Sequence, residues 1–223
     1  MRATCDQPGS LAPFTRVLFA AALVAVPPLG GCASSSDGDV HRSALAAERF
    51  AMAVVEFTPG DEAGFGQDRM PDVVFGPPRG AGERQGSLDV VALGHGGRIT
   101  LELGRPIVDG DGPDFIVFEN AFLVGESVVF AEPATVSVSD DGETFAAFPC
   151  DPETKPYDGC AGVAPVFANV DKNDIDPSDV EAAGGDAFDL ADVSLPSARF
   201  VRIIDGAMGM GESPSAGFDL DAI

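Results

Sequence analysis

The sequence predicts an all-β protein, more specifically an antiparallel β-sandwich. Short apolar runs recur from residue 51 to residue 223, and clusters of Gly, Pro and Asp separate them. Many short strands divided by turn residues are typical of sandwiches. After residue 50 the apolar residues show no long helical periodicity, although one or two helical turns are expected from Ser178 onward. No internal repeat is visible.

Nine apolar runs are expected to form the strands. In order along the chain they are AMAVVEF (51–57), LDVVAL (88–93), RITLEL (98–103), DFIVFEN (114–120), SVVFAE (127–132), ATVSVS (134–139), ETFAAF (143–148), RFVRII (199–204) and GFDLDAI (217–223). In the third run, Ile99, Leu101 and Leu103 alternate with polar residues that include Thr100. This alternation predicts a strand with one face in the core and the other in solvent.

The fourth run has a different pattern. DFIVFEN is apolar at successive positions until it reaches Glu119 and Asn120. Continuous apolar runs are typical of strands that are buried on both faces. We therefore expect a central strand whose polar end emerges at the rim of the sheet.

Asp140, Asp141 and Gly142 separate two alternating segments. Because Asp and Gly tolerate positive φ, these residues predict a hairpin. The whole phrase ATVSVSDDGETFAAF resembles the strand, turn and strand of discoidin-like and galactose-binding-like domains. ARFVRIIDG (198–206) and GFDLDAI (217–223) resemble the last strands of those domains. The resemblance implies a jelly-roll sandwich.

A closer resemblance covers most of residues 51–223. It is carried by the blocks GSLDVVALGHGGRITLEL, DGPDFIVFENAF, FAEPATVSVSDDG, AGGDAFDL and GFDLDAI. These blocks are similar to a family of uncharacterised bacterial cell-surface proteins and lipoproteins. The length of this part of the chain suits one core, so a single domain is expected over residues 51–223.

The start of the chain has the layout of a signal peptide. Two arginines precede an apolar stretch of 13 residues (17–29), whereas a transmembrane helix needs roughly 20. The stretch ends in LGGC (29–32), which resembles the bacterial lipobox. We expect residues 1–31 to be removed, Cys32 to be lipidated and residues 32–50 to form a flexible tether.

Charge limits the class of partner. The chain has 13 basic and 36 acidic residues, and removal of residues 1–31 leaves 11 and 35, a net charge of −24. Phosphate binding requires the opposite sign, so no nucleic-acid partner is expected. We expect the protein to contact the membrane through the lipid on Cys32. Ala33 replaces the Asp that signals inner-membrane retention in some bacteria, so the outer membrane or cell surface is the expected location.

Two further cysteines predict a disulfide. Once Cys32 carries lipid, Cys150 and Cys160 remain as a pair, separated by the polar turn sequence DPETKPYDG. Disulfides persist in oxidising compartments outside the cytoplasm. We expect a bridge that closes a surface loop and contributes roughly 3 kcal/mol in the chain-entropy model.

Acidic residues suggest a structural Ca²⁺ site. Asp114 ends the acidic loop DGDGPD (109–114), close to Glu119, but this loop does not fit an EF-hand. The resemblance implies a different site, because galactose-binding-like sandwiches often hold calcium near their final strand, where Asp219 and Asp221 occur. Two carboxylates on one strand face repel each other unless a cation or an arginine compensates them.

Two alternatives for these acids stay open. Arg202 on a neighbouring strand is a candidate ion-pair partner for Asp219 and Asp221. The acids are also abundant enough to be a solvated face that binds nothing.

The expected function is non-catalytic binding or adhesion at the cell surface, with a glycan or a protein as ligand. The chain has no tryptophan and a single tyrosine, Tyr157, so the aromatic platforms common in sugar sites are missing. The alternative is a surface polysaccharide hydrolase that uses Glu119 and Glu132, which requires the two carboxyls to lie roughly 5 to 9 Å apart. His41 and His95 lie in the tether and in a Gly-rich turn, and no nucleophile elbow is present.

Overall fold

The computed structural model describes residues 48–206 and 212–223. The expected signal peptide, Cys32 and all but the last three residues of the expected tether lie outside these ranges. The described residues belong to one compact unit. None of the helices in these ranges has the length and apolar composition needed to cross a membrane.

The described chain consists of short strands with three single-turn 3-10 helices. In order the elements are β1 (Ala51–Thr58), η1 (Gln67–Arg69), η2 (Asp72–Val74), β2 (Val91–Ala92), β3 (Arg98–Val108), β4 (Phe115–Val117), β5 (Phe122–Val124), β6 (Val128–Phe130), β7 (Ala134–Ser139), β8 (Ala146–Ala147), β9 (Asp186–Phe188), η3 (Leu190–Val193), β10 (Ser197–Asp205) and β11 (Asp219–Leu220). Every strand pair is antiparallel. The expected all-β antiparallel class is confirmed.

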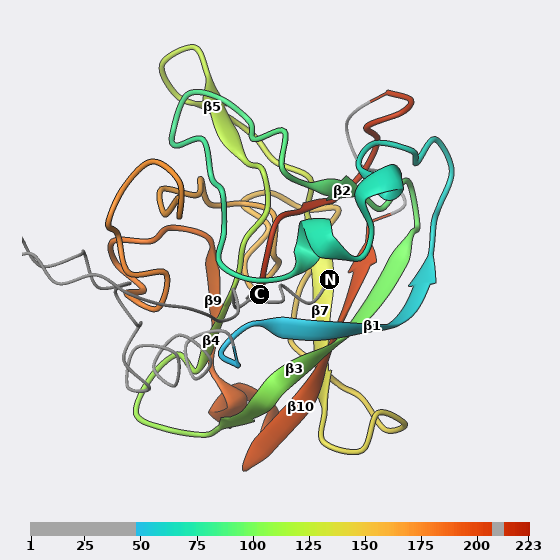
Figure 1. Cartoon of the computed structure of the whole chain (residues 1–223), viewed down its shortest axis with the longest axis vertical. Helices are drawn as coiled ribbons and strands as arrows, with labels where there is room; N and C mark the ends of the chain where they lie inside the picture. Colours follow the sequence, from blue (N-terminus) through green and yellow to red (C-terminus); the bar gives the residue numbers. More distant parts are fainter. Residues whose placement is uncertain (1–47, 207–211) are drawn as a thin grey trace, which may run out of the picture. The chain divides into compact units, whose positions relative to one another are not determined.

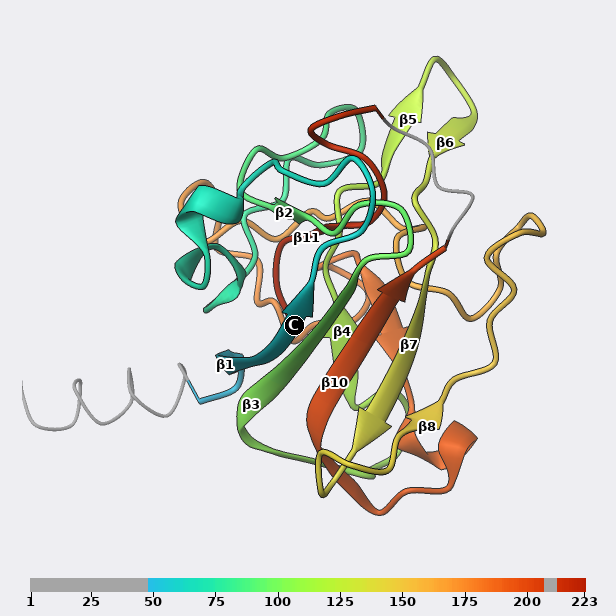
Figure 2. The same ribbon diagram turned by 90° about the vertical axis from the view of Figure 1, so that its right-hand side faces the viewer.

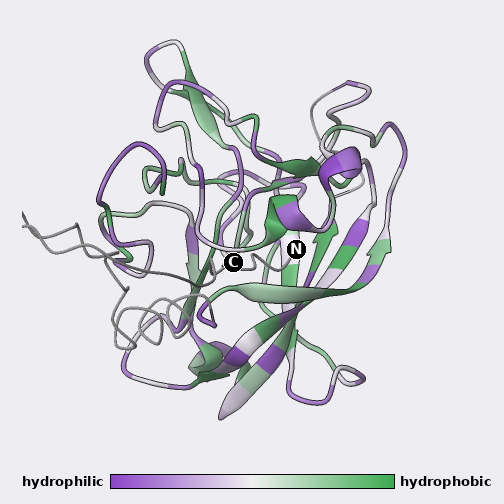
Figure 3. Cartoon of the chain, viewed as in Figure 1, coloured by the Kyte–Doolittle hydropathy of each residue, from purple (hydrophilic) through white to green (hydrophobic). Residues whose placement is uncertain are grey.

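One layer is a five-stranded sheet in the order β1-β3-β10-β7-β8 (Figures 1 and 2). β10 lies in its middle, where Ile203 is paired with Ile99 of β3 and with Val136 of β7. Apolar and polar residues alternate along β10 and β3 (Figure 3). The apolar set of each strand is buried, so one face of the sheet forms the core.

The other layer consists of two short ladders, β4–β9 and β2–β11. A bridge between Phe118 and Ala222 connects the end of β4 to the end of β11. Phe115, Val91 and Leu220 of this layer belong to the same buried cluster as the inner face of the large sheet. The ladders therefore cover that face, and β5 and β6 form a separate hairpin (Figure 2).

Two expectations about strand faces need correction. Thr100 was expected in solvent, but it is buried. The side chain of Arg202 in β10 covers it: Arg202 Nε donates a hydrogen bond to Thr100 Oγ1 over 3.0 Å, and the guanidinium group of Arg202 stacks over the ring of Phe145. The run DFIVFEN forms β4, which pairs with β9, and its Phe118 bridges to Ala222, so the run lies in the second layer and not in the five-stranded sheet. Its polar end does not emerge at a rim, since Glu119 is buried.

The turn and the disulfide were predicted correctly. β7 pairs with β8, and Gly142 between them has a φ of +77°. Asp141 Oδ1 accepts hydrogen bonds from the backbone N–H groups of Glu143 and Thr144, which holds the turn closed. Cys150 and Cys160 are bridged, with a Cα–Cα distance of 4.9 Å.

Candidate metal centre

The ends of β4 and β11 bring two acidic residues together. Phe118 N–H donates to Ala222 O over 2.9 Å, and Asp221 N–H donates to Phe118 O over 3.0 Å. These bonds place Glu119 beside Asp219, whose backbone N–H donates to Glu119 Oε1 over 3.3 Å. Two residues that are 100 positions apart in the sequence thus become neighbours in the core.

Glu132 lies near this pair, because the charges of Glu119 and Asp219 act on its carboxyl, but no hydrogen bond of the described chain joins it to either residue. It precedes β7, and its backbone N–H donates to Gly162 O over 3.1 Å. Gly162 has a φ of +84°, and a Cβ there would lie 2.3 Å from Glu132 O, so only glycine permits this close approach. The exposed fractions of Glu119, Glu132 and Asp219 are 1%, 2% and 3%.

Each of these three carboxyls has one oxygen without a hydrogen-bond partner. The atoms are Glu119 Oε2, Glu132 Oε1 and Asp219 Oδ1. The other oxygen of Asp219, Oδ2, accepts from Asn120 Nδ2 and from Ser215 Oγ, both over 3.3 Å. No lysine or arginine of the described chain forms an ion pair with any of the three carboxyls. A buried carboxylate in this state is costly unless it binds a proton or a cation.

Burial and mutual repulsion shift the pKa values of this cluster upward. Burial, together with the charges of Glu119, Asp219 and Asp205, raises the pKa of Glu132 to about 10. Burial, followed by the charge of Asp219, raises the pKa of Glu119 well above its ordinary value. Burial raises the pKa of Asp219 to about 6. The carboxyls therefore lie close enough to repel one another when they are ionised.

Three other acids near the core have a different role, because their oxygens bind backbone N–H groups. Asp205, at the end of β10, accepts from Phe218 N over 2.8 Å and from Gly96 N over 3.0 Å. Asp186 accepts from the N–H groups of residues 162, 163 and 164. Asp221 accepts from Arg79 N with both oxygens, over 2.8 and 3.1 Å. These acids attach loops to strands.

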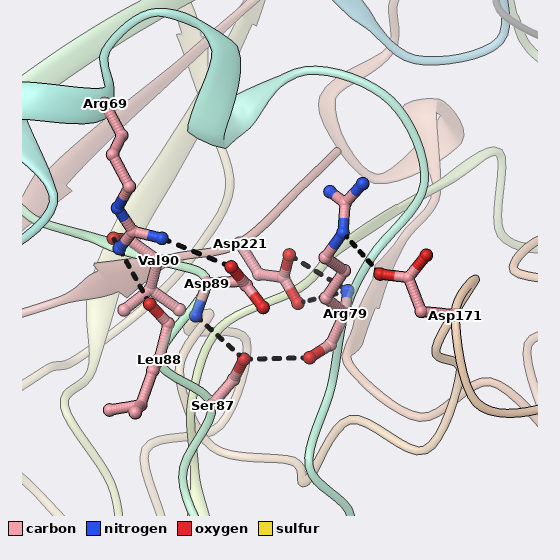
Figure 4. A network of polar contacts seen from close by, with 8 residues as sticks. All are labelled: Arg69, Arg79, Ser87, Leu88, Asp89, Val90, Asp171 and Asp221. Carbon is pink, nitrogen blue, oxygen red and sulfur yellow. Dashed lines mark hydrogen bonds and ion pairs between the residues drawn. The ribbon is translucent and has the colours of Figure 1, made fainter.

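Figure 4 shows the surroundings of Asp221. Arg79 continues the network by donating from Nε to Asp171 over 2.9 Å, and Arg79 O accepts from Ser87 Oγ over 2.8 Å. Asp89 N–H donates to the same hydroxyl over 3.1 Å. The network attaches the loop before β2 to the C-terminal strand, and no hydrogen bond of the described chain gives Asp221 and Asp219 a shared partner.

Asp114 lies in a second group of acids, together with Asp109 and Asp189. One carboxylate oxygen from each of these residues lies within 4.8 Å of the others. Both oxygens of Asp114 accept backbone hydrogen bonds, from Gly110 N over 2.9 Å and from Leu190 N over 2.8 Å. No hydrogen bond in the described ranges joins Asp114 to Glu119 or Asp219. The four expected calcium ligands are therefore not all brought together.

The structure also bears on the two alternatives for Asp219 and Asp221. Arg202 forms an ion pair with Glu56 over 3.8 Å and does not pair with either aspartate. Asp219 and Asp221 are both buried, so they are not a solvated face.

Sequence reasoning associated Glu119 with Asp219 and named Glu132 only as half of a catalytic pair. It missed Asp205 and Asp186. The available signal was weak: Asp205 directly follows the apolar run of β10, and Asp186 begins β9, two residues before Phe188. Acidic residues at such positions are frequent in this chain.

No protein-family model matches the chain, and no curated protein sequence matches it either.

Proposed function

We propose that the chain is a non-catalytic binding module, a jelly-roll β-sandwich that is stabilised by a structural Ca²⁺ ion. More particularly, it is an exported lipoprotein, anchored through Cys32 in the outer membrane or at the cell surface, that binds a surface glycan or protein. The observation that carries the calcium proposal is the set of three buried, unpartnered oxygens on Glu119, Glu132 and Asp219.

The chemistry of this set favours calcium among the common cations. All three open atoms are carboxylate oxygens, and Ca²⁺ takes six to eight oxygen ligands in flexible geometry. Zinc prefers His and Cys ligands, and the one histidine nitrogen of the described chain that is buried without a partner, His95 Nδ1, does not belong to this set. Among the described residues only Asp109, Asp114 and Asp189 have carboxylate oxygens that all lie within 4.8 Å of one another. An ion shared by Glu119, Glu132 and Asp219 would therefore draw these side chains together, and its charge would offset their mutual repulsion.

Export is supported by two independent features. The LGGC quartet closes a short apolar stretch, as expected for lipid attachment at Cys32. The Cys150–Cys160 disulfide is of a kind that persists outside the reducing cytoplasm. The jelly-roll assignment is supported by the two packed layers and by the resemblance of the strands from β7 onward.

The calcium proposal is tested by melting curves of residues 33–223, the mature chain without its lipidated Cys32. We expect EDTA to lower the melting temperature and Ca²⁺ to restore it at constant ionic strength. At a hundredfold excess over Kd the gain is about 2.7 kcal/mol. Asp219→Asn should blunt the response and Asp140→Asn in the hairpin should not. Superimposed curves in EDTA and Ca²⁺, or an equal effect of Na⁺ at matched ionic strength, would disprove the site.

The ligand is tested on a glycan array, with and without Ca²⁺. Retention of a glycan without release of product supports binding. Release of product that is lost in Glu119→Gln and Glu132→Gln would instead establish the hydrolase. The low exposure of these two residues favours binding, because a polysaccharide chain has no access to carboxyls that are 1% and 2% exposed.

A further inference from the structure

A groove of about 820 Å³ lies beside the second layer of the fold. The end of β3 and the beginning of β4 form its apolar wall, with Leu103, Ile107, Phe115 and Ile116 among the lining residues. Its volume falls within the roughly 300 to 1,000 Å³ of typical small-molecule sites. The groove is therefore large enough to hold a ligand of that size.

Exposed valines extend this apolar surface. Val108, Val170 and Val180 all line the groove, and their exposed fractions are 66%, 50% and 40%. They come from the end of β3 and from the loop between residues 169 and 185, so distant parts of the sequence supply one apolar surface. Contiguous exposed apolar surface on a soluble protein is typical of a binding site.

The arginines of the groove differ from the other arginines of the described chain. Six of the eight described arginines form ion pairs with carboxylates, namely Arg69, Arg79, Arg84, Arg98, Arg199 and Arg202. Arg49 and Arg105 form no ion pair with any described residue, and both line the groove. In a chain with 36 acidic and 13 basic residues, two such guanidinium groups at one groove mark a place for an external anion.

The carboxylates of the groove already have partners. Asp114 accepts backbone hydrogen bonds with both oxygens. Asp176 Oδ1 accepts from Ser178 N over 2.9 Å and from Ser178 Oγ over 2.7 Å. Hydrogen bonds from Ser178 and, as a smaller contribution, the charge of Arg49 lower the pKa of Asp176. The groove thus combines an apolar lining with two guanidinium groups that form no ion pair with a described residue and have hydrogen-bond donors to offer.

We propose that this groove binds a long-chain fatty acid, with the hydrocarbon chain against the apolar wall and the carboxylate on Arg49 and Arg105. A planar guanidinium group matches a carboxylate with two parallel hydrogen bonds. This inference goes beyond the proposed function and does not depend on calcium or on the lipid anchor.

The test uses cis-parinaric acid, a fluorescent fatty acid, and its uncharged methyl ester, each titrated into residues 33–223, the mature chain without its lipidated Cys32. We expect saturable binding of the acid and at least tenfold weaker binding of the ester. Arg105→Gln should weaken binding of the acid about tenfold, as expected for the loss of a charge-assisted hydrogen bond, and leave the ester unchanged. Val180→Asp should weaken binding of both ligands, and because Val180 is exposed the substitution leaves the buried core unchanged.

Matched controls use positions outside the groove. Arg84 is an exposed arginine that pairs with Glu83, and Val124 is an exposed valine of the β5–β6 hairpin. Arg84→Gln and Val124→Asp should leave the affinity for the acid unchanged. Equal affinity for acid and ester, or an equal effect of Arg84→Gln and Arg105→Gln, would overturn the proposal.

One further outcome would overturn it. If the acid binds to residues 48–223 but not to residues 33–223, the chain's own segment before residue 48 is the occupant of the groove. The melting temperature of each variant, measured without ligand, identifies any variant that has lost its fold.

Discussion

Asp205 Oδ1 accepts a hydrogen bond from Phe218 N–H over 2.8 Å, whereas Asp219, the next residue, has a carboxylate oxygen with no partner. Burial raises the pKa of Asp219, and the charge of Asp205 adds a smaller increase, so the two acids lie close together. Asp205 thus completes the backbone hydrogen bonding of the strand ends, whereas the open oxygen of Asp219 remains available to a proton or a cation. Substitutions can separate these two roles.

Glu132→Gln should abolish the calcium response and leave the calcium-free protein nearly unchanged. Because the pKa of Glu132 is raised to about 10, its carboxyl is neutral at pH 7 without metal, and Gln resembles the neutral acid in shape. We expect the melting temperature in EDTA to stay close to that of the parent, while the gain of about 2.7 kcal/mol in excess Ca²⁺ is lost. Scanning calorimetry in both buffers measures the two quantities.

Asp205→Asn is the contrasting variant. Both carboxylate oxygens of Asp205 accept hydrogen bonds from backbone N–H groups. In Asn the side-chain NH₂ replaces one of these oxygens and faces a backbone N–H, so two donors meet and one hydrogen bond is lost. We expect a loss of about 1 to 3 kcal/mol in EDTA and in Ca²⁺ alike. A loss that appears only in Ca²⁺ would show that Asp205 is a ligand.

The calcium-free protein should become less stable as the pH rises from about 4 to about 7. Burial raises the pKa of Asp186 and Asp219 to about 6 and that of Asp221 to about 7, from an ordinary value of 3.8. The folded state then binds more protons than the unfolded state, so the stability present below pH 4 is lost as the pH rises through the folded pKa values. Melting temperatures in EDTA should fall across this range. Ca²⁺ should reduce the fall, and a rise in EDTA would contradict the prediction.

Replacing Cys150 and Cys160 together by Ala should lower the free energy of unfolding by about 3 kcal/mol, because the unfolded chain loses a closed loop. Chemical denaturation of both proteins measures the change. Intact mass after alkylation supplies the control: the parent should gain two alkyl groups only after reduction. Alkylation without reduction would show free thiols.

Replacing Cys32 by Ser should abolish lipid attachment and leave unprocessed or soluble protein, because the hydroxyl cannot form the thioether to diacylglycerol. Metabolic labelling with a palmitate analogue reports the lipid, and fractionation reports the location. Label that persists on the Cys32→Ser protein would refute the anchor. Parent protein found only in the inner membrane would refute the outer-membrane location.

The sequence predicted the local elements well because they depend on neighbouring residues. The alternation of Ile99, Leu101 and Leu103 identified a buried strand face, and Asp141 with Gly142 identified the hairpin. The candidate site was predicted only in part, because it depends on which strand ends meet. The sequence named Glu119, Glu132 and Asp219 as candidates, but no pattern in it shows which of them become neighbours. Nor does it show that Asp221 accepts hydrogen bonds from the backbone of Arg79.

Thr100 shows the same limit on a smaller scale. Strand alternation placed it on the solvent face, and that assignment follows from the period of two. Its burial comes from Arg202, a residue 102 positions later, whose long side chain covers the outer face. Coverage by a long side chain on a neighbouring strand is not visible in the pattern of one strand.

The hydrogen bonds of Asp186, Asp205 and Asp221 have a consequence for amide hydrogen exchange. Each of these carboxylates holds amides that belong to irregular chain, including Gly162, Gly96 and Arg79, segments that would ordinarily exchange quickly. Opening any of these loops would leave a buried carboxylate without its donors, so local fluctuations there are suppressed. We expect these loop amides to exchange together with the strands that carry the aspartates, so that the loop-rich half of the protein opens cooperatively.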